Sequence, residues 1–350
     1  MIDPINLSKE LIKFRSISPN SSGSLEFLSK ILSEHKFKCN LLEFGKNKVK
    51  NLYAVYKGGV GPNICFAGHT DVVPPGDEND WNSDPFQPLI KNGKIFGRGA
   101  SDMKTAIAAY ISSVSLFLSD KNYSFNGSIS FLLTADEEGD ADYGTKKVIE
   151  WLKSKKSKPD FCLVGEPTNP SKIGEMVKIG RRGSLNGIIT INGKQGHVAY
   201  PEKAKNPIDD LVSICKELQK PLDSGSKAFQ PSNLVVTSVD VNNNVTNLIP
   251  QRASIRFNIR FNDNFNSKQL IKLVKDRISK KSIDFKLEYK VSGESFFNYS
   301  EKLTDALTNS IKKVTKIKPE LSTSGGTSDA RFISKICPVI EFGMIGKTMH

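Results

Sequence analysis

The chain carries the stretch Phe66-Ala67-Gly68-His69-Thr70-Asp71-Val72-Val73-Pro74, in which an apolar run ends abruptly at a histidine and an aspartate. The pattern predicts a buried strand over Asn63–Ala67 that presents His69 at its end. Ligands in α/β proteins usually bind at such strand ends. A neutral imidazole is a good zinc ligand, and Asp71 can orient the ring through its other nitrogen. A capped strand end with incidental polar residues is the alternative interpretation.

Outward from this stretch, helical and extended patterns alternate through the first half of the chain. This alternation predicts an α/β sandwich with a mostly parallel or mixed sheet. The expected elements are a helix at Leu25–His35, strands at Asn51–Lys57 and Asn63–Ala67, a helix at Met103–Leu118, a strand at Ser128–Thr134, a helix at Gly144–Lys153 and a strand at Phe161–Val164.

The pattern changes near Lys178 to the order β-α-β-β-α-β, which is that of a ferredoxin-like unit. Its expected elements are Ser184–Ile191, Pro207–Leu218, Leu234–Val241, Ala253–Phe261, Ser267–Lys280 and Phe285–Val291. A helix, a short helix and a strand are expected to follow at Glu301–Lys316, Ala330–Ile333 and Val339–Phe342. We therefore expect an α/β domain at 1–178 and 294–350, with a smaller domain inserted at 179–293.

Composition excludes several classes of protein. The 350 residues are 38% hydrophobic, which is enough for two domains, and no apolar run reaches the ~18 residues of a membrane span. The net charge of +13 comes from dispersed lysines without interleaved aromatics, so no nucleic-acid partner is expected. The start of the chain does not resemble a signal peptide. The five scattered cysteines include no CxxC pair and predict reduced thiols, so we expect a cytoplasmic protein without a membrane partner.

Four more segments place metal-binding side chains beside strands or glycines. They are Gly97–Lys104 with Asp102, Leu133–Gly139 with Glu137 and Glu138, Val164–Thr168 with Glu166, and Phe342–His350 with the terminal His350. Each segment also has an ordinary interpretation. Asp102 could be a helix N-cap, and the acidic segment at Leu133–Gly139 could be a solvated turn. Glu166 could be a turn residue, and His350 could be part of a frayed chain end. Together, however, two histidines and several carboxylates at strand ends form a ligand set suited to two zinc ions.

In this arrangement the sequence resembles the co-catalytic di-zinc peptidases and deacylases, a family that includes aminoacylase, acetylornithine deacetylase and glutamate carboxypeptidase. The resemblance runs from about Leu11 to His350. It is densest at Gly68–Pro75, Gly97–Lys104, Thr134–Gly139, Gly165–Thr168, Gly180–Ser184, Gly196–Pro201, Ser324–Phe332 and Glu341–His350. It implies a zinc-peptidase-like α/β sandwich catalytic domain with an inserted ferredoxin-like dimerisation domain.

The resemblance also implies roles for individual residues in a metal-dependent amidohydrolase with two zinc ions per subunit, or cobalt in one site. Asp102 would bridge both ions. His69 and Glu166 would complete one site, and Glu138 and His350 the other. Glu137 would be the general base and acid, and Asp71 would orient His69.

Within this family the sequence most resembles the desuccinylases, which act in lysine and diaminopimelate biosynthesis. The segments Gly180–Ser184 and Ser324–Phe332 carry this closer resemblance. The expected substrate is a small anionic N-succinyl amino acid, N-succinyl-LL-2,6-diaminopimelate, attacked by a zinc-activated water. By resemblance, the substrate contacts would be Arg181, Ser184, Tyr200, Asn247, Arg260, Gly326 and Thr327. His197 would reach across a homodimer to stabilise the oxyanion. A turn asparagine and an exposed strand arginine are the alternatives for Asn247 and Arg260.

Two rival functions stay open on sequence alone. An acetylornithine deacetylase or an aminoacylase would share the zinc chemistry and differ in the acyl pocket. A metal-free binding protein could keep the same fold. The resemblance also implies a further segment after the final histidine, whereas this sequence stops at His350. The second zinc is therefore expected to be loose, partly occupied or absent.

Overall fold

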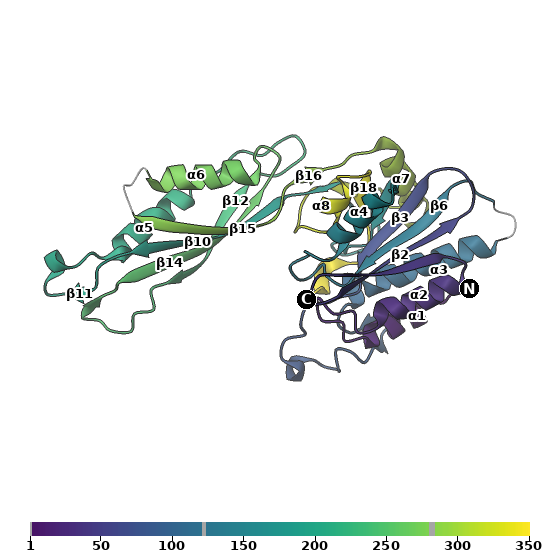
Figure 1. Cartoon of the computed structure of the whole chain (residues 1–350), viewed down its shortest axis with the longest axis horizontal. Helices are drawn as coiled ribbons and strands as arrows, with labels where there is room; N and C mark the ends of the chain where they lie inside the picture. The colour runs from purple at the N-terminus through teal and green to yellow at the C-terminus, as the bar shows by residue number, and fades with distance from the viewer. Residues whose placement is uncertain (1, 121–123, 280–283) are drawn as a thin grey trace. The chain divides into compact units, whose positions relative to one another are not determined.

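The structure is a computed structural model, and it describes residues 2–120, 124–279 and 284–350. The described residues divide into two compact units (Figure 1). The second unit comprises Gly180–Phe297 together with Thr323–Thr327, and the first comprises the rest. By comparison, the sequence-based boundaries gave the inserted domain as 179–293 and left Thr323–Thr327 with the catalytic part.

The first unit is built on a mixed sheet flanked by helices (Figure 1). In spatial order its strands are β1 (Lys38–Phe44), β2 (Val49–Lys57), β6 (Ser128–Thr134), β3 (Asn63–His69), β7 (Phe161–Val164), β18 (Val339–Glu341), β8 (Met176–Lys178) and β17 (Glu320–Ser322). Strands β6, β3, β7 and β18 run parallel to one another, whereas β1 and β2 add antiparallel edges. The helices are α1 (Pro4–Lys13), α2 (Ser24–Glu34), α3 (Thr105–Ser119), α4 (Thr145–Ser154), α7 (Glu301–Thr315) and α8 (Ala330–Ile333).

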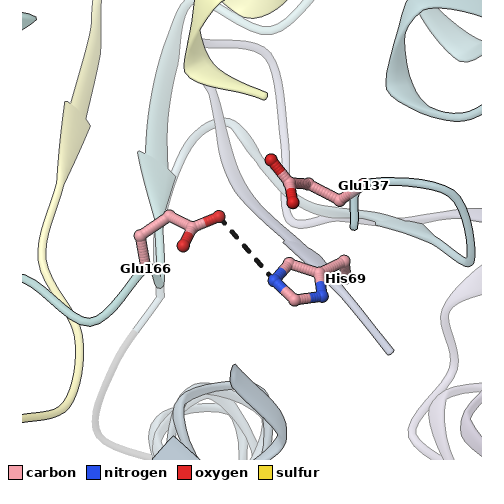
Figure 2. Close-up of side chains that lie close together, drawn as sticks. All are labelled: His69, Glu137 and Glu166. Carbon is pink, nitrogen blue, oxygen red and sulfur yellow. Dashed lines mark ion pairs between the residues drawn. The ribbon is translucent and has the colours of Figure 1, made fainter. Parts of the chain in front are cut away.

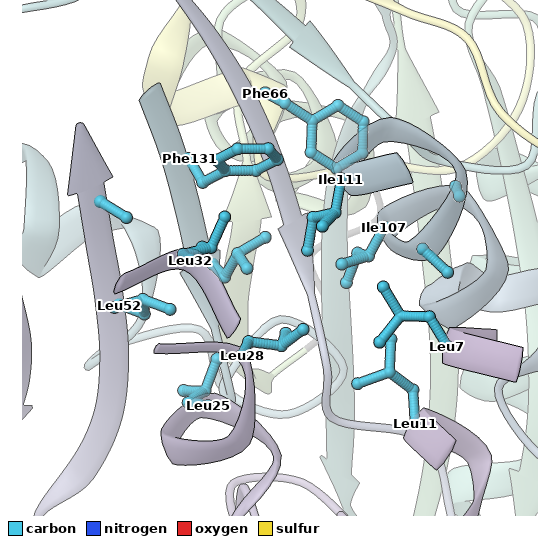
Figure 3. Close-up of a cluster of buried hydrophobic side chains, with 14 of the residues drawn as sticks. Leu7, Leu11, Leu25, Leu28, Leu32, Leu52, Phe66, Ile107, Ile111 and Phe131 are labelled. Carbon is cyan, nitrogen blue, oxygen red and sulfur yellow. The ribbon is translucent and has the colours of Figure 1, made fainter. Parts of the chain in front are cut away.

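The core of the first unit lies between the sheet and helices α1, α2 and α3 (Figure 3). Side chains alternate between the two faces of a strand. Leu52 and Ala54 of β2 therefore point into this core, whereas the Tyr53 ring packs against Trp151 of α4, on the other face. Phe131 of β6 lies at the centre of the core and contacts the ring of Phe37.

Smaller elements complete the first unit. A hairpin joins β4 to β5, and irregular or 3-10 turns lie next to the sheet. Their bounds are β4 (Leu89–Lys91), β5 (Lys94–Phe96), η1 (Glu78–Asp80), η2 (Ala100–Lys104) and η4 (Gly346–Thr348).

The second unit is an antiparallel sheet with the strand order β12-β14-β10-β15, and helices α5 and α6 pack on it. Its main elements are β10 (Gly183–Asn192), α5 (Pro207–Leu218), β12 (Asn233–Asp240), β14 (Arg252–Phe261), α6 (Ser267–Ser279) and β15 (Phe285–Gly293). Its short elements are β9 (Gly180–Arg181), β11 (Gly196–His197), η3 (Pro201–Lys203), β13 (Leu248–Ile249) and β16 (Phe296–Phe297). This strand order is the ferredoxin-like one, so the expected α/β fold with its inserted β-α-β-β-α-β unit is confirmed.

The elements differ from the sequence-based expectations at a few places. The helix expected from Met103 begins at Thr105, because the preceding residues form the irregular turn η2. The strand expected to stop at Ala67 continues to His69. Helix α6 ends at Ser279 among the described residues, and Lys280, the predicted end of that helix, lies outside them.

Two expectations about the whole chain can be compared with the structure. All five cysteines are free thiols, as their scattered spacing predicted. Within residues 2–120, 124–279 and 284–350, no helix is both long and apolar enough to cross a membrane.

The central position of Phe131 gives a stability prediction. Replacement of Phe131 by alanine leaves a cavity in the first unit and should lower the melting temperature of that unit by on the order of 10 °C. Scanning calorimetry would measure the shift. The matched control is Phe96→Ala, because this ring is largely exposed. Equal shifts for the two variants would contradict the placement of the core.

Candidate metal centre

The candidate centre lies at the carboxyl edge of the parallel strands in the first unit. His69 is the last residue of β3, Glu137 follows β6, and Glu166 follows β7. Because β6, β3 and β7 run parallel side by side, their carboxyl ends meet at one edge of the sheet. Figure 2 shows the side chains of His69, Glu137 and Glu166 converging there.

Asp102 enters the centre from the irregular turn η2. Gly99, which precedes it, has a φ of +83°, a conformation that suits glycine and turns the chain towards the strand ends. One carboxylate oxygen of Asp102, Oδ1, lies 3.2 Å from Nε2 of His69, and Oδ2 lies 3.5 Å from Nε2 of His350. A single carboxylate thus faces both histidines.

The last residues of the chain are held against the first unit. The amide of Gly346 donates to the carbonyl of Asn169 at 2.9 Å, and the side-chain amide of Asn169 donates to the carbonyl of Gly343 at 2.8 Å. The hydroxyl of Ser101 donates to the carbonyl of Ile345. His350 is 53% exposed, yet its Nε2 lies 3.3 Å from Oε1 of Glu138.

Side chains with metal-binding atoms gather in two overlapping groups among the described residues. Ligand atoms of His69, Glu137 and Glu166 lie within 4.8 Å of one another, as do those of His69, Asp102 and Glu138. Nε2 of His69 is 3.8 Å from Oε1 of Glu166. The structure therefore brings together all five residues expected as metal ligands, with Asp102 between the two histidines.

Asp71 is the buried residue that connects these groups. Its Oδ2 accepts hydrogen bonds from the backbone amides of Glu137 and Glu138, each at 3.0 Å. Its own carbonyl accepts from Nδ1 of His69 at 2.8 Å. A carbonyl can only accept, so Nδ1 carries a hydrogen, and Nε2 is the ring nitrogen that faces the carboxylates of Asp102 and Glu166.

The crowding of carboxylates shifts their titration. Burial raises the pKa of Glu137 to about 8, and the Asp329 carboxylate adds to this effect. Burial and then Asp102 raise the pKa of Glu166 well above its usual range. Burial alone would lower the pKa of His69, but Asp102, Glu166 and Asp71 outweigh it and raise that pKa.

Asp102 shifts in the opposite direction. Burial alone would raise its pKa, but the contacts with His350 and His69 lower the pKa well below the usual range. Several negative groups thus lie close together here. The two histidines can balance this charge only when they are protonated. Bound cations remove the mutual repulsion without those protons.

The donor set fits metal ions of the zinc type. Imidazole nitrogen and carboxylate oxygen are ordinary zinc ligands, and the protonated Nδ1 of His69 leaves the opposite nitrogen free to bind. Among the described residues Oδ1 of Asp71 is buried without a hydrogen-bond partner and lies 3.7 Å from Nδ1 of His69, so its negative charge favours positive charge on the His69 side. The residues present therefore fit bound metal cations, and the carboxylate of Asp102 faces both histidines of the set.

Two residues beside Glu137 were not among the sequence-based candidates. Nη1 of Arg331 lies 3.8 Å from Oε1 of Glu137, and both side chains are largely buried. The carboxylate of Asp329 is buried, and its negative charge adds to the raised pKa of Glu137. In the sequence, Asp329 and Arg331 stand close together after the glycines at 325 and 326, at the start of a short helix. This spacing is the feature that could have identified them.

The expected oxyanion and trans residues lie together in the second unit. His197 in β11 is the register partner of Leu248 in β13, and the amide of Val198 donates to the carbonyl of Asn247 at 3.2 Å. The ring of Tyr200 lies 6.0 Å from that of His197. His197 and Tyr200 therefore lie on one exposed segment, and Asn247 lies on a second exposed segment that pairs with it.

The remaining substrate candidates form another group in the second unit. Ser184 and Arg260 are register partners on β10 and β14. Nη1 of Arg181 packs against Gly325. A Cβ atom added to that glycine would lie 2.7 Å from Nη1. The space around Gly326 is open, and the hydroxyl of Thr327 is buried without a hydrogen-bond partner in the described part of the chain. A guanidinium and a free hydroxyl suit a carboxylate ligand.

Comparison with known proteins identifies relatives of this arrangement. The sequence model of peptidase family M20/M25/M40 matches residues 65–350. The succinyl-diaminopimelate desuccinylase of Pelagibacter ubique is 54% identical over 99% of this chain and 92% of its own length. The protein of the same name from Wolbachia pipientis of Culex pipiens is 51% identical over 100% of this chain and 87% of its own length.

Solved structures share the fold at low sequence identity. An M20 family metallo-carboxypeptidase from Sulfolobus solfataricus superposes with a TM-score of 0.80 at 20% identity, over 98% of this chain and 91% of the other. A dinuclear metal-binding peptidase of the M20 family from Bacillus subtilis gives a TM-score of 0.66 at 16% identity, over 97% and 88% of the two chains.

The contacts of Asp71 give a prediction about metal affinity. In Asp71→Asn the amide would lose the negative charge and turn an NH2 group towards Nδ1–H of His69. Zinc affinity should fall by roughly 10- to 100-fold. Calorimetric titration of metal-free protein with Zn²⁺ would measure it, with the exposed Asp142→Asn as the control. An unchanged affinity would contradict the role given to Asp71.

Proposed function

Because the chain belongs to peptidase family M20/M25/M40, we infer that it is a succinyl-diaminopimelate desuccinylase. It hydrolyses the amide bond of N-succinyl-LL-2,6-diaminopimelate and releases succinate and LL-2,6-diaminopimelate, a step in diaminopimelate and lysine biosynthesis. The observation that carries this function is Glu137, whose side chain is 12% exposed, beside a centre of histidines and carboxylates in a chain about half identical to desuccinylases along its whole length.

The proposed centre holds two zinc ions per subunit, with cobalt possible in one site. His69, Glu166 and Asp102 would hold one ion, and Asp102, Glu138 and His350 the other. When bound, such ions polarise the amide carbonyl and make a water acidic enough to lose its proton near neutral pH. The protein's part is to hold the ligands in place, which Asp71 does through its contacts with both loops.

Glu137 is the proposed proton carrier. It would accept the proton of the attacking water and return it to the leaving amine, as a general base and then a general acid. Burial, which raises its pKa to about 8, brings this carboxyl close to the operating pH of such a carrier. Arg331, 3.8 Å away, limits the directions in which the carboxylate can turn.

Substrate recognition is proposed to use residues of the second unit. Arg181, Ser184, Gly326 and Thr327 would bind the succinyl carboxylate, while Arg260 and Tyr200 would contact the rest of the substrate. The positive charge of Arg181 supports this assignment, because a guanidinium and a carboxylate form strong charge-assisted hydrogen bonds.

The active form is proposed to be a cytoplasmic homodimer joined through the inserted unit. His197 and Asn247 would then reach the active site of the partner subunit, where His197 would stabilise the oxyanion of the tetrahedral intermediate. Both residues are exposed and lie on paired segments of the second unit, which supports an intersubunit role.

A hydrolysis assay tests the function. The purified protein should release succinate from N-succinyl-LL-2,6-diaminopimelate at least 100-fold faster than it releases acetate from N-acetylornithine, because an acetyl group has no carboxylate for Arg181 to bind. Chelation should abolish turnover and added Zn²⁺ should restore it. A preference for N-acetylornithine would instead show an acetylornithine deacetylase.

Mixed dimers test the roles of Glu137 and His197. Glu137→Gln should keep its zinc and lose turnover, and His197→Ala should lose most of it. Co-expressed, the two variants form mixed dimers in which one site has both residues, so random pairing should give about one quarter of the wild-type activity. The control is Glu137→Gln co-expressed with a Glu137→Gln, His197→Ala chain, which restores no site. Absence of recovery in the mixture would argue against His197 acting in trans.

A further inference from the structure

Two buried charged residues that are not candidate metal ligands are neighbours in the sheet of the first unit. Lys178 of β8 is the register partner of Glu341 of β18 on one side and of Ser322 of β17 on the other. Register partners place their side chains on the same face of a sheet. Lys178 is 5% exposed and Glu341 1% exposed, so both charges lie inside the protein. Buried charges of this kind need each other and further hydrogen bonds.

Each member of the pair contacts a serine. Nζ of Lys178 lies within hydrogen-bonding distance, 3.2 Å, of Oγ of Ser322, and the hydroxyl of Ser328 donates to Oε1 of Glu341. Both serines are buried. They stand immediately before and after the segment Thr323–Thr327, so the neighbouring Lys178 and Glu341 hold its two ends.

The segment between the two serines carries the open face of Gly326 and the unpartnered hydroxyl of Thr327. It also approaches Arg181 at Gly325, and the hydroxyl of Thr323 donates to the carbonyl of Ala228 at 2.6 Å. These contacts place it among the proposed substrate-binding residues.

We propose that Lys178 and Glu341 form a positioning pair, which anchors both ends of the 323–327 loop and so orders Gly326 and Thr327 for substrate binding. The proposal rests on the proposed function for the identity of the substrate. Neither residue touches the reacting groups. Their contribution is to restrict the loop before substrate arrives, because a loop that must be ordered on binding weakens that binding.

The serines give the sharpest test, since they can be altered without touching the charges. The double variant Ser322→Ala, Ser328→Ala should raise KM for N-succinyl-LL-2,6-diaminopimelate roughly tenfold, the effect of losing two ordinary hydrogen bonds, while kcat changes less than twofold. The control is Ser130→Ala. That serine is equally buried and its hydroxyl donates to Asn63 at 2.8 Å, but it lies in β6. An unchanged KM in the double variant, or an equal rise in the control, overturns the proposal.

The charged pair gives a second test that separates stability from positioning. Lys178→Met alone should lower the melting temperature by on the order of 10 °C, because Glu341 is left as an uncompensated buried charge. Adding Glu341→Leu should recover most of that loss, since an apolar pair can replace a buried ion pair. The recovered double variant should still have the raised KM. Recovery of KM along with stability would show a purely structural pair.

Hydrogen–deuterium exchange makes the result independent of activity. The amides of residues 323–327 should exchange at least tenfold faster in the double serine variant than in the wild type, with no change in the Ser130→Ala control. If the wild type does not hydrolyse N-succinyl-LL-2,6-diaminopimelate, the proposed function fails, and the exchange rates alone decide the anchoring. Unchanged exchange overturns it.

Discussion

The centre depends on one buried carboxylate, that of Asp71. Its side chain holds the backbone amides of Glu137 and Glu138, and its carbonyl holds Nδ1 of His69. Two neighbouring strands therefore present their terminal residues in a fixed relation. A histidine and a glutamate on separate loops would otherwise move independently, and side chains that must meet a metal ion tolerate errors of only about half an ångström. The same carbonyl fixes the hydrogen on Nδ1 of His69, and the buried carboxylate of Asp71 adds negative charge beside that ring.

The same arrangement leaves the centre with an excess of negative charge. Asp71, Asp102, Glu137, Glu138 and Glu166 converge within a small volume, and burial together with neighbouring carboxylates raises the pKa of Glu137 and of Glu166. Protein folds tolerate such repulsion where a cation offsets it. The arrangement thus favours metal binding over a purely structural acidic turn, which was the ordinary interpretation of the acidic segment after β6.

Much of this fold was predictable because its central strands and helices follow simple periodic patterns. Strands β6 and β7 and helix α5 begin and end at the predicted residues. Helix α1 was not predicted, although Leu7 and Leu11 lie one turn apart and are buried. The short strands β8 and β17 were not predicted either. Three residues are too few to show an alternating apolar pattern, and these strands are defined by their neighbours in the sheet.

The site was predictable to a different degree. The candidate metal ligands follow strands or glycines that local sequence reveals, and the structure brings them together. Asp329 and Arg331 could not be assigned in the same way, because their proximity to Glu137 results from the packing of a distant segment. Lys178 and Glu341 are harder still to find. Each is an ordinary charged residue in its own strand, and only the register of β8 with β18 makes them neighbours.

The division of labour between the two units suggests why one fold can serve several substrates. The candidate metal ligands all belong to the first unit, whereas Arg181, Ser184, Arg260 and Thr327 belong to the second. The chain returns to the second unit once more at Thr323–Thr327, so the proposed substrate contacts from two distant parts of the sequence share that unit. Hydrolysis requires the candidate metal ligands of the first unit to keep their identity. Changes in the second set can alter the acyl group that binds without disturbing the carboxylates and histidines, because binding and chemistry use different side chains.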